Sequence, residues 1–421
     1  MKPRVLIIAP HGSYRTSAFV AAAHQLKADV LIASEGKHSI VSDYAHGLHI
    51  EFQDAAASLK LILDEAEKKP FSAIIATDDS STELAAKASA ELRLPYNPLA
   101  AVTLSRRKDL ARQCLAQHGV PIPEFHIVNL EISLEPQLIN INYPVVVKPV
   151  ALSGSRGVIR ANNYNELVHA IQRIEMILKK EGDQEHKSRH SLLVESFIAG
   201  DEVALEGMLH NGELEILNVF DKPDPLDGPF FEETYYITPS RHAQKILNEL
   251  HQVVTDACTA YGLKEGPIHA ECRINDKGVW VLEVAARTIG GLCGRLLQFG
   301  TGHSLEELVL TQAMGKSLSN VSIKNDAAGV LMIPIPRAGI LKRVEGQFEA
   351  SRIEFIESVE IQIREGYELV PLPEGSNYLG FIFARAPSAE QAESALRDAH
   401  ARLKIVVAPL WKIQGDAVAA V

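Results

Sequence analysis

The chain of 421 residues has room for about two to four domains, and 46% hydrophobic with 23% charged residues is typical of folded globular proteins. Its net charge of −11 disfavours nucleic acid or an anionic membrane as partner, because both attract basic surfaces. The four cysteines lack C-x-x-C spacing, and no stretch is apolar enough for a secretion signal or a membrane span. We therefore expect a reduced, cytoplasmic protein.

Residues 1–105 alternate short apolar runs with amphipathic stretches. This alternation predicts an α/β unit with a doubly wound parallel sheet. The turn after the first strand lacks G-x-G-x-x-G, which argues against a dinucleotide site. Asp78 and Asp79 follow a buried strand, where such a sheet binds ligands, but they would equally well cap the next helix. The expected strands cover 5–9, 29–33 and 73–77, and the expected helices 17–27, 54–68 and 82–92.

The sequence changes character after this unit. A helix over 106–118 ends at Gly119 and is followed by two prolines, which suggests a crossing between domains. The chain then becomes strand-rich, with a polar stretch at 181–190 that we expect to be a mobile surface loop. A third unit starts near Asp326, and the residues after Trp411 are expected to form a frayed tail.

The stretch 266–287 predicts a β-hairpin. Its strands are joined by Asp276-Lys277-Gly278, and a three-residue loop that ends in glycine is a common hairpin turn with a bulge. The resulting register places Glu271 opposite Glu283. Opposed carboxylates repel each other and often hold a cation, and Mg²⁺ is usual where phosphates complete the shell. A solvated charged face, with Arg273 as counter-charge, is the alternative.

Alternation along the two strands assigns the faces of this hairpin. One face is expected to carry the chemistry and the other to join the core. The expected polar face consists of His269, Glu271, Arg273, Glu283 and Arg287, and the expected core face of Ile268, Ala270, Cys272, Ile274, Trp280, Leu282 and Val284.

Two other segments suggest a phosphorylated ligand. Lys148 ends a buried valine run, and the Ser153–Gly157 loop after it offers backbone N–H groups and hydroxyls to an anion. An apolar strand at 192–197 leads through a short linker to Glu202. Such a linker can hold a flat base, and the carboxylate can accept hydrogen bonds from a ribose. Taken singly, each segment is also explained as an ordinary strand and turn.

Three motifs in a fixed order resemble the ATP-grasp superfamily. They are Lys148 with its glycine-rich loop, VESFIAGDE at 194–202 and HAEC…LEVAAR at 269–287. Within this superfamily, Arg107-Lys108-Asp109, GPFFEET at 228–234 and the glycines after Arg287 resemble the L-amino-acid ligase (dipeptide synthase) branch. The resemblance covers most of the chain and implies the ATP-grasp architecture. The implied parts are an N-terminal domain at 1–105, an ATP-grasp domain at 106–320 and a C-terminal α+β segment at 321–421. The implied divisions of the ATP-grasp domain are a linker helix at 106–124, a lid at 125–200 and a large subdomain at 201–320.

The resemblance also implies a nucleotide site. Lys108 and Lys148 would hold the phosphates of ATP, and Gly154 and Ser155 would lie in the loop that covers them. Glu202 would bind the ribose. The adenine hinge would consist of Glu195, Ser196, Phe197 and Ile198.

The same resemblance implies the metal ligands and the reaction. Glu271 and Glu283 would bind Mg²⁺, with Mn²⁺ as a substitute, and Arg287 would stabilise the transferring phosphoryl group. Ala285 stands where many superfamily members have an asparagine ligand. The implied reaction is ATP-dependent carboxylate–amine ligation through an acyl phosphate, with release of ADP and phosphate. The alternatives are a biotin-carboxylase-like enzyme and a non-catalytic nucleotide-binding protein.

Small-molecule carboxylates and amines, above all amino acids, would be the partners, and the resemblance suggests a homodimer. His269 is a candidate base or substrate-orienting residue, or else it simply holds a glutamate. Glu232 and Glu233 would anchor an ammonium group, unless they belong to a solvated loop. Gly290 and Gly291 would leave space at the floor of the pocket for a bulky substrate.

Overall fold

The computed structural model describes residues 2–11, 13–35, 47–180, 188, 190–297, 302–316 and 326–410. The expected loop at 181–190 falls almost entirely outside the described residues, and the expected tail after Trp411 falls wholly outside them. None of the helices in the described part combines the length and the apolar character that crossing a bilayer requires.

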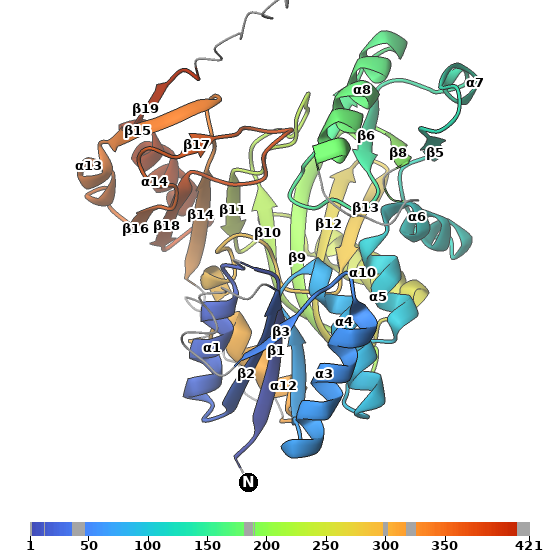
Figure 1. The fold of residues 1–421 in the computed structure, drawn as a ribbon. Coiled ribbons are helices and arrows are strands. Elements are labelled where there is room, and N and C mark those ends of the chain that lie inside the picture. Colours follow the sequence, from blue (N-terminus) through green and yellow to red (C-terminus); the bar gives the residue numbers. More distant parts are fainter. Residues whose placement is uncertain are drawn as a thin grey trace, which may run out of the picture.

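The N-terminal region is a parallel sheet with helices on both faces, as predicted (Figure 1). The strand order is β3-β2-β1-β4. Successive residues of β1 point to opposite faces, so Val5 and Ile7 pack with α1 and α12 while Leu6 and Ile8 pack with α3 and α4. The elements are β1 (Arg4–Ala9), α1 (Thr16–Gln25), β2 (Asp29–Glu35), β3 (Gly47–Ile50), α3 (Ala55–Lys68), β4 (Ala73–Ala76), α4 (Asp79–Glu91) and α12 (Leu305–Ala313).

Two helices connect this region to an antiparallel four-stranded sheet. The predicted helix at 106–118 proves to be α6 (Lys108–Gln117), which follows α5 (Leu99–Arg106) after a break at Arg107, where the backbone is extended. The four strands have the order β5-β8-β6-β7, and α8 packs on β6 and β7. These elements are β5 (Phe125–Asn129), α7 (Glu135–Leu138), β6 (Val145–Pro149), β7 (Ile159–Ala161), α8 (Tyr164–Lys180) and β8 (Ser191–Ser196).

The largest sheet has eight antiparallel strands in the order β13-β12-β9-β10-β11-β14-β18-β16. It continues without interruption across the expected boundary at 320/321, because β14 pairs with β11. A separate three-stranded sheet, β17-β15-β19, stands at the C-terminal end. The elements are β9 (Asp201–His210), β10 (Glu213–Lys222), β11 (Tyr235–Thr238), α10 (Gln244–Tyr261), β12 (Gly266–Asn275), β13 (Gly278–Ala285), β14 (Ala327–Ile333), β15 (Gly339–Glu345), α13 (Gln347–Ser351), β16 (Ile356–Ile361), β17 (Glu368–Leu369), β18 (Gly380–Ala386), α14 (Ala389–Arg402) and β19 (Lys404–Ala408).

The turn of the β12–β13 hairpin differs from the prediction, yet the pairing of its glutamates is confirmed. Asn275 pairs with Gly278, so the turn has two residues and not three. The register shifts beside Glu271, so Leu282 in β13 is a bulge residue without an opposite partner. This bulge restores the residue that the shorter turn lacks. The two differences cancel, and Glu271 lies opposite Glu283.

The bulge also changes which residues of β13 face the core. Val279 and Val281 lie in the hydrophobic cluster that includes α10, whereas Trp280 and Leu282, which were expected there, do not. Leu282 instead lines a cavity. The predicted face was wrong for these two residues, because one inserted residue reverses the alternation of side chains between the turn and the bulge.

Gly200 forms the sharp connection between β8 and β9. Its φ of +132° is unfavourable for residues with a side chain, and a Cβ there would lie 2.1 Å from the carbonyl oxygen of Ile274. Glycine thus lets the segment that carries the expected adenine hinge pass directly over β12.

We expect Gly200→Ala to lower the midpoint of thermal unfolding clearly more than Gly262→Ala. Gly262 also has a positive φ, +76°, but a Cβ there would meet no atom within 4 Å. Gly262→Ala therefore measures backbone strain alone, about 1–2 kcal/mol, while Gly200→Ala adds a clash with backbone. Equal shifts of the two midpoints in calorimetry would contradict this account.

Candidate active site

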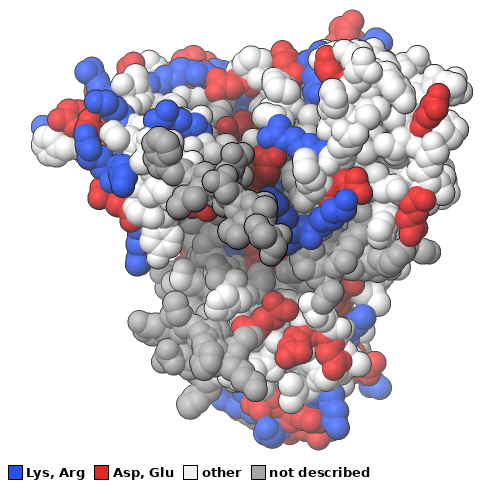
Figure 2. All heavy atoms as spheres, turned by 45° about the horizontal axis from the view of Figure 1, so that its top comes forward, with Lys and Arg blue, Asp and Glu red and all other residues white. Residues whose placement is uncertain are grey.

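A cavity of about 760 Å³ lies where the N-terminal sheet, the four-stranded sheet and the eight-stranded sheet meet. Every predicted site residue lines this cavity except Glu232. In Figure 2, acidic and basic side chains gather around the hollow in the middle of the molecule. The cavity therefore collects the predicted residues from segments that lie far apart in the sequence.

One face of the eight-stranded sheet forms the floor of this cavity. Lys222 on β10, Glu202 on β9 and Arg273 on β12 are direct neighbours in register, and so are Glu206 and His269. Side chains that stand beside one another across strands interact most strongly. The floor is therefore a row of alternating charges, and that alternation offsets the cost of burying each of them.

The two opposed glutamates of the hairpin each have a lysine partner. Lys108 Nζ lies 3.1 Å from Glu283, and Lys222 Nζ lies 3.5 Å from Glu271. Burial would raise the pKa of Glu271, but Lys222 and His269 hold it well below its ordinary value. The carboxylate oxygens of Glu271 and Glu283 are hard donors of the kind that Mg²⁺ prefers, so these two glutamates fit a divalent ion.

A second group of carboxylates lies around Lys222. The motifs in the sequence did not indicate this lysine. Oxygen atoms of Glu202, Glu233 and Glu271 all lie within 4.8 Å of one another. The Lys222 ammonium contacts all three, at 2.8 Å from Glu202, and it also lies over the Tyr236 ring. Burial would lower the pKa of Lys222, but the glutamates raise it well above its ordinary value. The chain thus supplies its own cation to this group.

His269 stands between two carboxylates. Its Nδ1 lies 3.1 Å from Glu206 and its Nε2 lies 3.5 Å from Glu271. Burial would lower the pKa of His269, but the hydrogen bonds to Glu206 and Glu271 raise it to about 9. A protonated imidazole cannot accept a proton from an amine. This geometry supports the interpretation in which His269 holds Glu271.

Glu206 itself was missed in the sequence. Its side chain is fully buried, and its other oxygen accepts a hydrogen bond from the backbone N–H of Ile289, at 3.1 Å. It therefore orients both His269 and the segment after Arg287. A lone glutamate in the apolar run of β9 was the available signal, because isolated buried charges need partners.

The lysine of the predicted phosphate site is held by a buried triad. Glu195 contacts both Lys148 and Arg112, and the Arg112 side chain also donates to the carbonyl of Leu282. Burial would raise the pKa of Glu195, but Arg112 and Lys148 hold it below its ordinary value. The Glu195 carboxylate thus positions Lys148. Arg112, only 2% exposed, was missed.

The other residues of the expected adenine hinge cluster at the junction of β8 and β9. Ser196, Phe197 and Ile198 line the cavity there. The Phe197 ring lies under the Arg160 guanidinium, at 4.1 Å, with Arg273 at 5.3 Å. At the expected phosphate end, Lys108 Nζ donates to the carbonyl of Leu152, at 3.0 Å, next to the glycine-rich loop.

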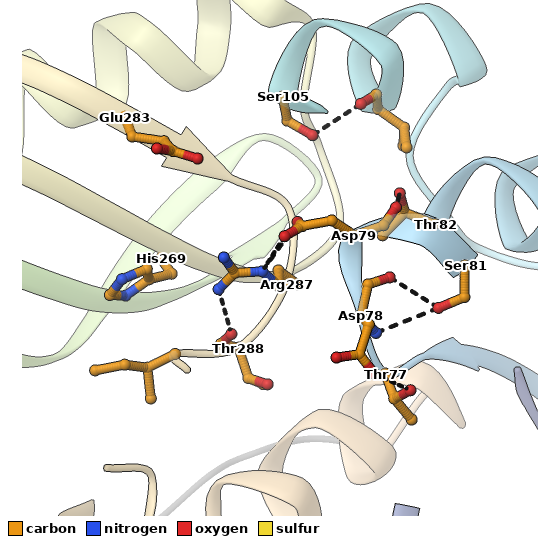
Figure 3. A network of polar contacts seen from close by, with 12 residues as sticks. Thr77, Asp78, Asp79, Ser81, Thr82, Ser105, His269, Glu283, Arg287 and Thr288 are labelled. Carbon is orange, nitrogen blue, oxygen red and sulfur yellow. Dashed lines mark hydrogen bonds and ion pairs between the residues drawn. The ribbon is translucent and has the colours of Figure 1, made fainter. Parts of the chain in front are cut away.

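Arg287 is oriented by Asp79, the first residue of α4 in the N-terminal region (Figure 3). Its Nε lies 2.9 Å from both carboxylate oxygens of Asp79, and Nη1 donates to the carbonyl of Thr288 at 2.9 Å. Burial would raise the pKa of Asp79, but Arg287 holds it below its ordinary value. Asp78 is the N-cap of α4 and accepts from Arg15 at 2.6 Å. Asp78 thus fits the helix-capping interpretation, and Asp79 pairs with Arg287.

The far end of the cavity is lined by apolar and aromatic groups. A Cβ on Gly291 would lie 3.3 Å from Met332 Sδ and 3.3 Å from the Phe381 ring. Cys293 lies 3.7 Å from Met332, and burial raises the pKa of its thiol, so it acts as a packing residue. Glycine at 291 keeps this end open.

Glu233 reaches into the cavity, whereas Glu232 does not line it. Tyr236 donates a hydrogen bond to Glu233, at 2.7 Å. Burial and the nearby Glu271 raise the pKa of Glu233 to about 7. Phe231 lines the cavity, while Phe230 packs under Arg173 outside it. Of the two glutamates expected to anchor an ammonium group, Glu233 therefore reaches the cavity and Glu232 does not.

We expect the imidazole of His269 to titrate near pH 9, above the ordinary value of 6.5. Because the folded pKa is raised, its contribution to stability is complete below pH 6.5 and is lost as pH rises through about 9. NMR of ¹⁵N-histidine protein would measure the midpoint, with His269→Asn to assign the signal and Glu206→Gln expected to lower it. A midpoint near 6.5 would contradict the ion-pair arrangement.

Comparisons with known proteins show what this chain is similar to. The protein-family model of the ATP-grasp domain matches residues 141–295. The family model of the L-amino acid ligase C-terminal domain 2 matches residues 331–408. An L-amino acid ligase from Bacillus licheniformis superposes with a TM-score of 0.85 and 26% identity, over 97% of this chain and 100% of that one. N5-carboxyaminoimidazole ribonucleotide synthetase of Thermotoga maritima, 18% identical with a TM-score of 0.70, shares the fold over 97% of this chain and 100% of that one.

Among curated proteins, uncharacterized protein y4rH of Sinorhizobium fredii is 26% identical over 69% of this chain and 59% of its own length. Dapdiamide A synthase of Enterobacter agglomerans is 26% identical over 59% of this chain and 58% of its own length. The chain thus spans somewhat under two thirds of these two relatives. The family models and the superposition nevertheless confirm the resemblance found in the sequence: residues 141–295 match the ATP-grasp domain, and the chain is similar to L-amino acid ligases.

Proposed function

We propose that this protein is an ATP-dependent ligase that joins a carboxylate to an amine, with amino acids as substrates and a dipeptide-like amide as product. The observation that carries the proposal is the meeting, in one cavity, of the opposed Glu271 and Glu283 with Lys148 and Arg287. Two anionic and two cationic groups around one space suit the transfer of a phosphoryl group, whose charge must be balanced on several sides. The two matching family models support the same proposal.

In the first step, the substrate carboxylate would attack the γ-phosphate of ATP, giving an acyl phosphate and ADP. Lys148, fixed by Glu195, and Lys108 would hold the phosphates in line with the carboxylate. Arg287, already oriented by Asp79, would stabilise the charge on the transferring group without reorganising during the reaction. Glu271 and Glu283 would bind Mg²⁺, which neutralises phosphate charge when present.

In the second step, an amine would attack the acyl carbon and expel phosphate. Glu233 is the candidate anchor for a substrate ammonium group, because its carboxylate faces the cavity beside the apolar end. The Met332 and Phe381 side chains at that end would receive an apolar substrate side chain. The glycine-rich loop would exclude water while the acyl phosphate exists.

The proposal predicts ADP release that depends on a pair of substrates. The protein is incubated with ATP and Mg²⁺ and with amino acids and small carboxylates, singly and in pairs, and products are measured by mass spectrometry. Ligation gives a product whose mass is the sum of the pair less water. Turnover stimulated by bicarbonate alone would instead indicate a carboxylase, and nucleotide binding without any turnover would indicate a non-catalytic protein.

Replacement of Arg287 by lysine should lower kcat by roughly 100- to 1,000-fold while changing the KM for ATP little. Lysine retains the charge but loses the planar fork that Asp79 holds in place. Asp79→Asn is the companion variant: it leaves Arg287 present but less firmly oriented, so its kcat should fall less. A rise in the KM for ATP with kcat unchanged in Arg287→Lys would place this guanidinium in nucleotide binding only.

A further inference from the structure

A loop of the C-terminal segment, residues 371–378, touches both ends of the cavity. Its last residues, Ser376, Asn377 and Tyr378, line the cavity, and Tyr378 packs on Phe381 at the apolar end. The earlier part of the loop reaches toward α8, as Figure 1 shows where the C-terminal segment approaches the four-stranded sheet. This loop therefore links the expected substrate end to the part of the chain that carries the glycine-rich loop.

Four hydrogen bonds join this loop to the glycine-rich loop and α8. The N–H of Gly157 donates to the carbonyl of Pro373, at 3.0 Å. Arg156 Nε donates to the backbone carbonyl of Glu374, at 2.8 Å. The Glu374 carboxylate accepts two bonds from the Arg173 guanidinium on α8, at 2.6 and 2.9 Å. Glu374 is thus bonded to both elements, through its carbonyl and through its carboxylate.

The loop is tightly built. Gly375 donates from its N–H to the carbonyl of Pro371, at 2.9 Å, and a Cβ on Gly375 would lie 1.9 Å from the carbonyl oxygen of Val370. A Cβ on Gly154 would lie 3.3 Å from that of Ser376, so the two loops are in close contact. A displacement at one end of such a loop is passed to the other end, because few alternative backbone conformations fit.

We propose that Glu374 is a positioning residue that holds the glycine-rich loop closed over the nucleotide and couples this closure to occupation of the substrate end. This inference rests on the proposed function for its kinetic consequence, but the contacts themselves do not. The bidentate Arg173–Glu374 pair fixes both partners in direction. Glu374 is partly exposed, so its ion pair with Arg173 contributes only a modest free energy. Because this pair joins the C-terminal loop to α8, even a modest free energy changes the ratio of open to closed forms of the glycine-rich loop several-fold.

Trypsin provides a direct test, because Arg156 lies in the glycine-rich loop and its Nε is bonded to the backbone carbonyl of Glu374. Glu374→Gln keeps this bond and changes only the carboxylate that pairs with Arg173. We expect Glu374→Gln to speed cleavage after Arg156 about three- to ten-fold, measured as fragments that begin at Gly157. The matched control is Glu345→Gln, which removes a similarly exposed glutamate bonded to Arg343 on β15, outside the cavity. Equal cleavage rates in the two variants would overturn the proposal.

A cycle of variants separates the pair from its surroundings. Arg173→Gln should speed cleavage as much as Glu374→Gln does, and the double variant should be no faster than either single variant. Additive effects would mean that the two side chains act independently, and would overturn the coupling. This measurement needs no turnover, so its outcome stands even where the proposed ligase activity fails.

Kinetics then test the coupling to substrate. Glu374→Gln should raise the KM for ATP several-fold and increase the ADP released per amide formed, because water reaches the acyl phosphate under a loosely held loop. Glu345→Gln should leave both quantities unchanged. Unchanged ADP-to-amide stoichiometry and KM in Glu374→Gln would show that its contacts are structural only.

Discussion

Repulsion between carboxylates is the constraint on which the rest of this site depends. Glu202, Glu233 and Glu271 converge at the floor of the cavity, with Glu283 directly opposite Glu271. Such a group would not remain ionised in a buried place without cations of its own. Lys222 is inserted among three of them, and Lys108 contacts the fourth. The protein thus carries a preformed balance of charge, and a divalent ion and a nucleotide would alter that balance rather than create it.

The same principle recurs at each functional side chain. Lys148 is held by Glu195, Arg287 by Asp79 and His269 by Glu206. In each case an acidic side chain is paired with a cation that lines the cavity. Groups fixed in this way need little reorganisation when charge develops on a substrate, which is the main way in which a protein accelerates phosphoryl transfer.

The glycine-rich loop is contacted by a different part of the chain, the C-terminal segment. It belongs to the four-stranded sheet, but its contacts at Gly157 and Arg156 come from the C-terminal segment. That segment also extends the central sheet through β14 and lines the apolar end of the cavity. Strands close to the C-terminus therefore complete a cavity whose acidic residues and expected phosphate-binding residues come from the middle of the chain.

The sequence by itself determined the elements whose signals are local. The alternation of apolar runs and amphipathic helices predicted the parallel sheet, and the order of motifs indicated the superfamily. The predicted pairing of Glu271 with Glu283 was also right, although the prediction assumed a three-residue turn. The actual turn is one residue shorter, and a bulge at Leu282, which the sequence does not indicate, compensates for the difference.

Only the tertiary structure decided which charges neutralise which. Lys222, Arg112 and Glu206 lie outside the motifs, and Asp79 reaches Arg287 from a strand end about two hundred positions earlier in the chain. The structure also assigned Glu195 to Lys148 and separated Glu233 from Glu232. Periodicity reports whether a side chain faces the core or the solvent. It does not report which distant residue stands opposite, because that follows from the packing of whole sheets, and burial makes the opposite partner decide the state of each charge.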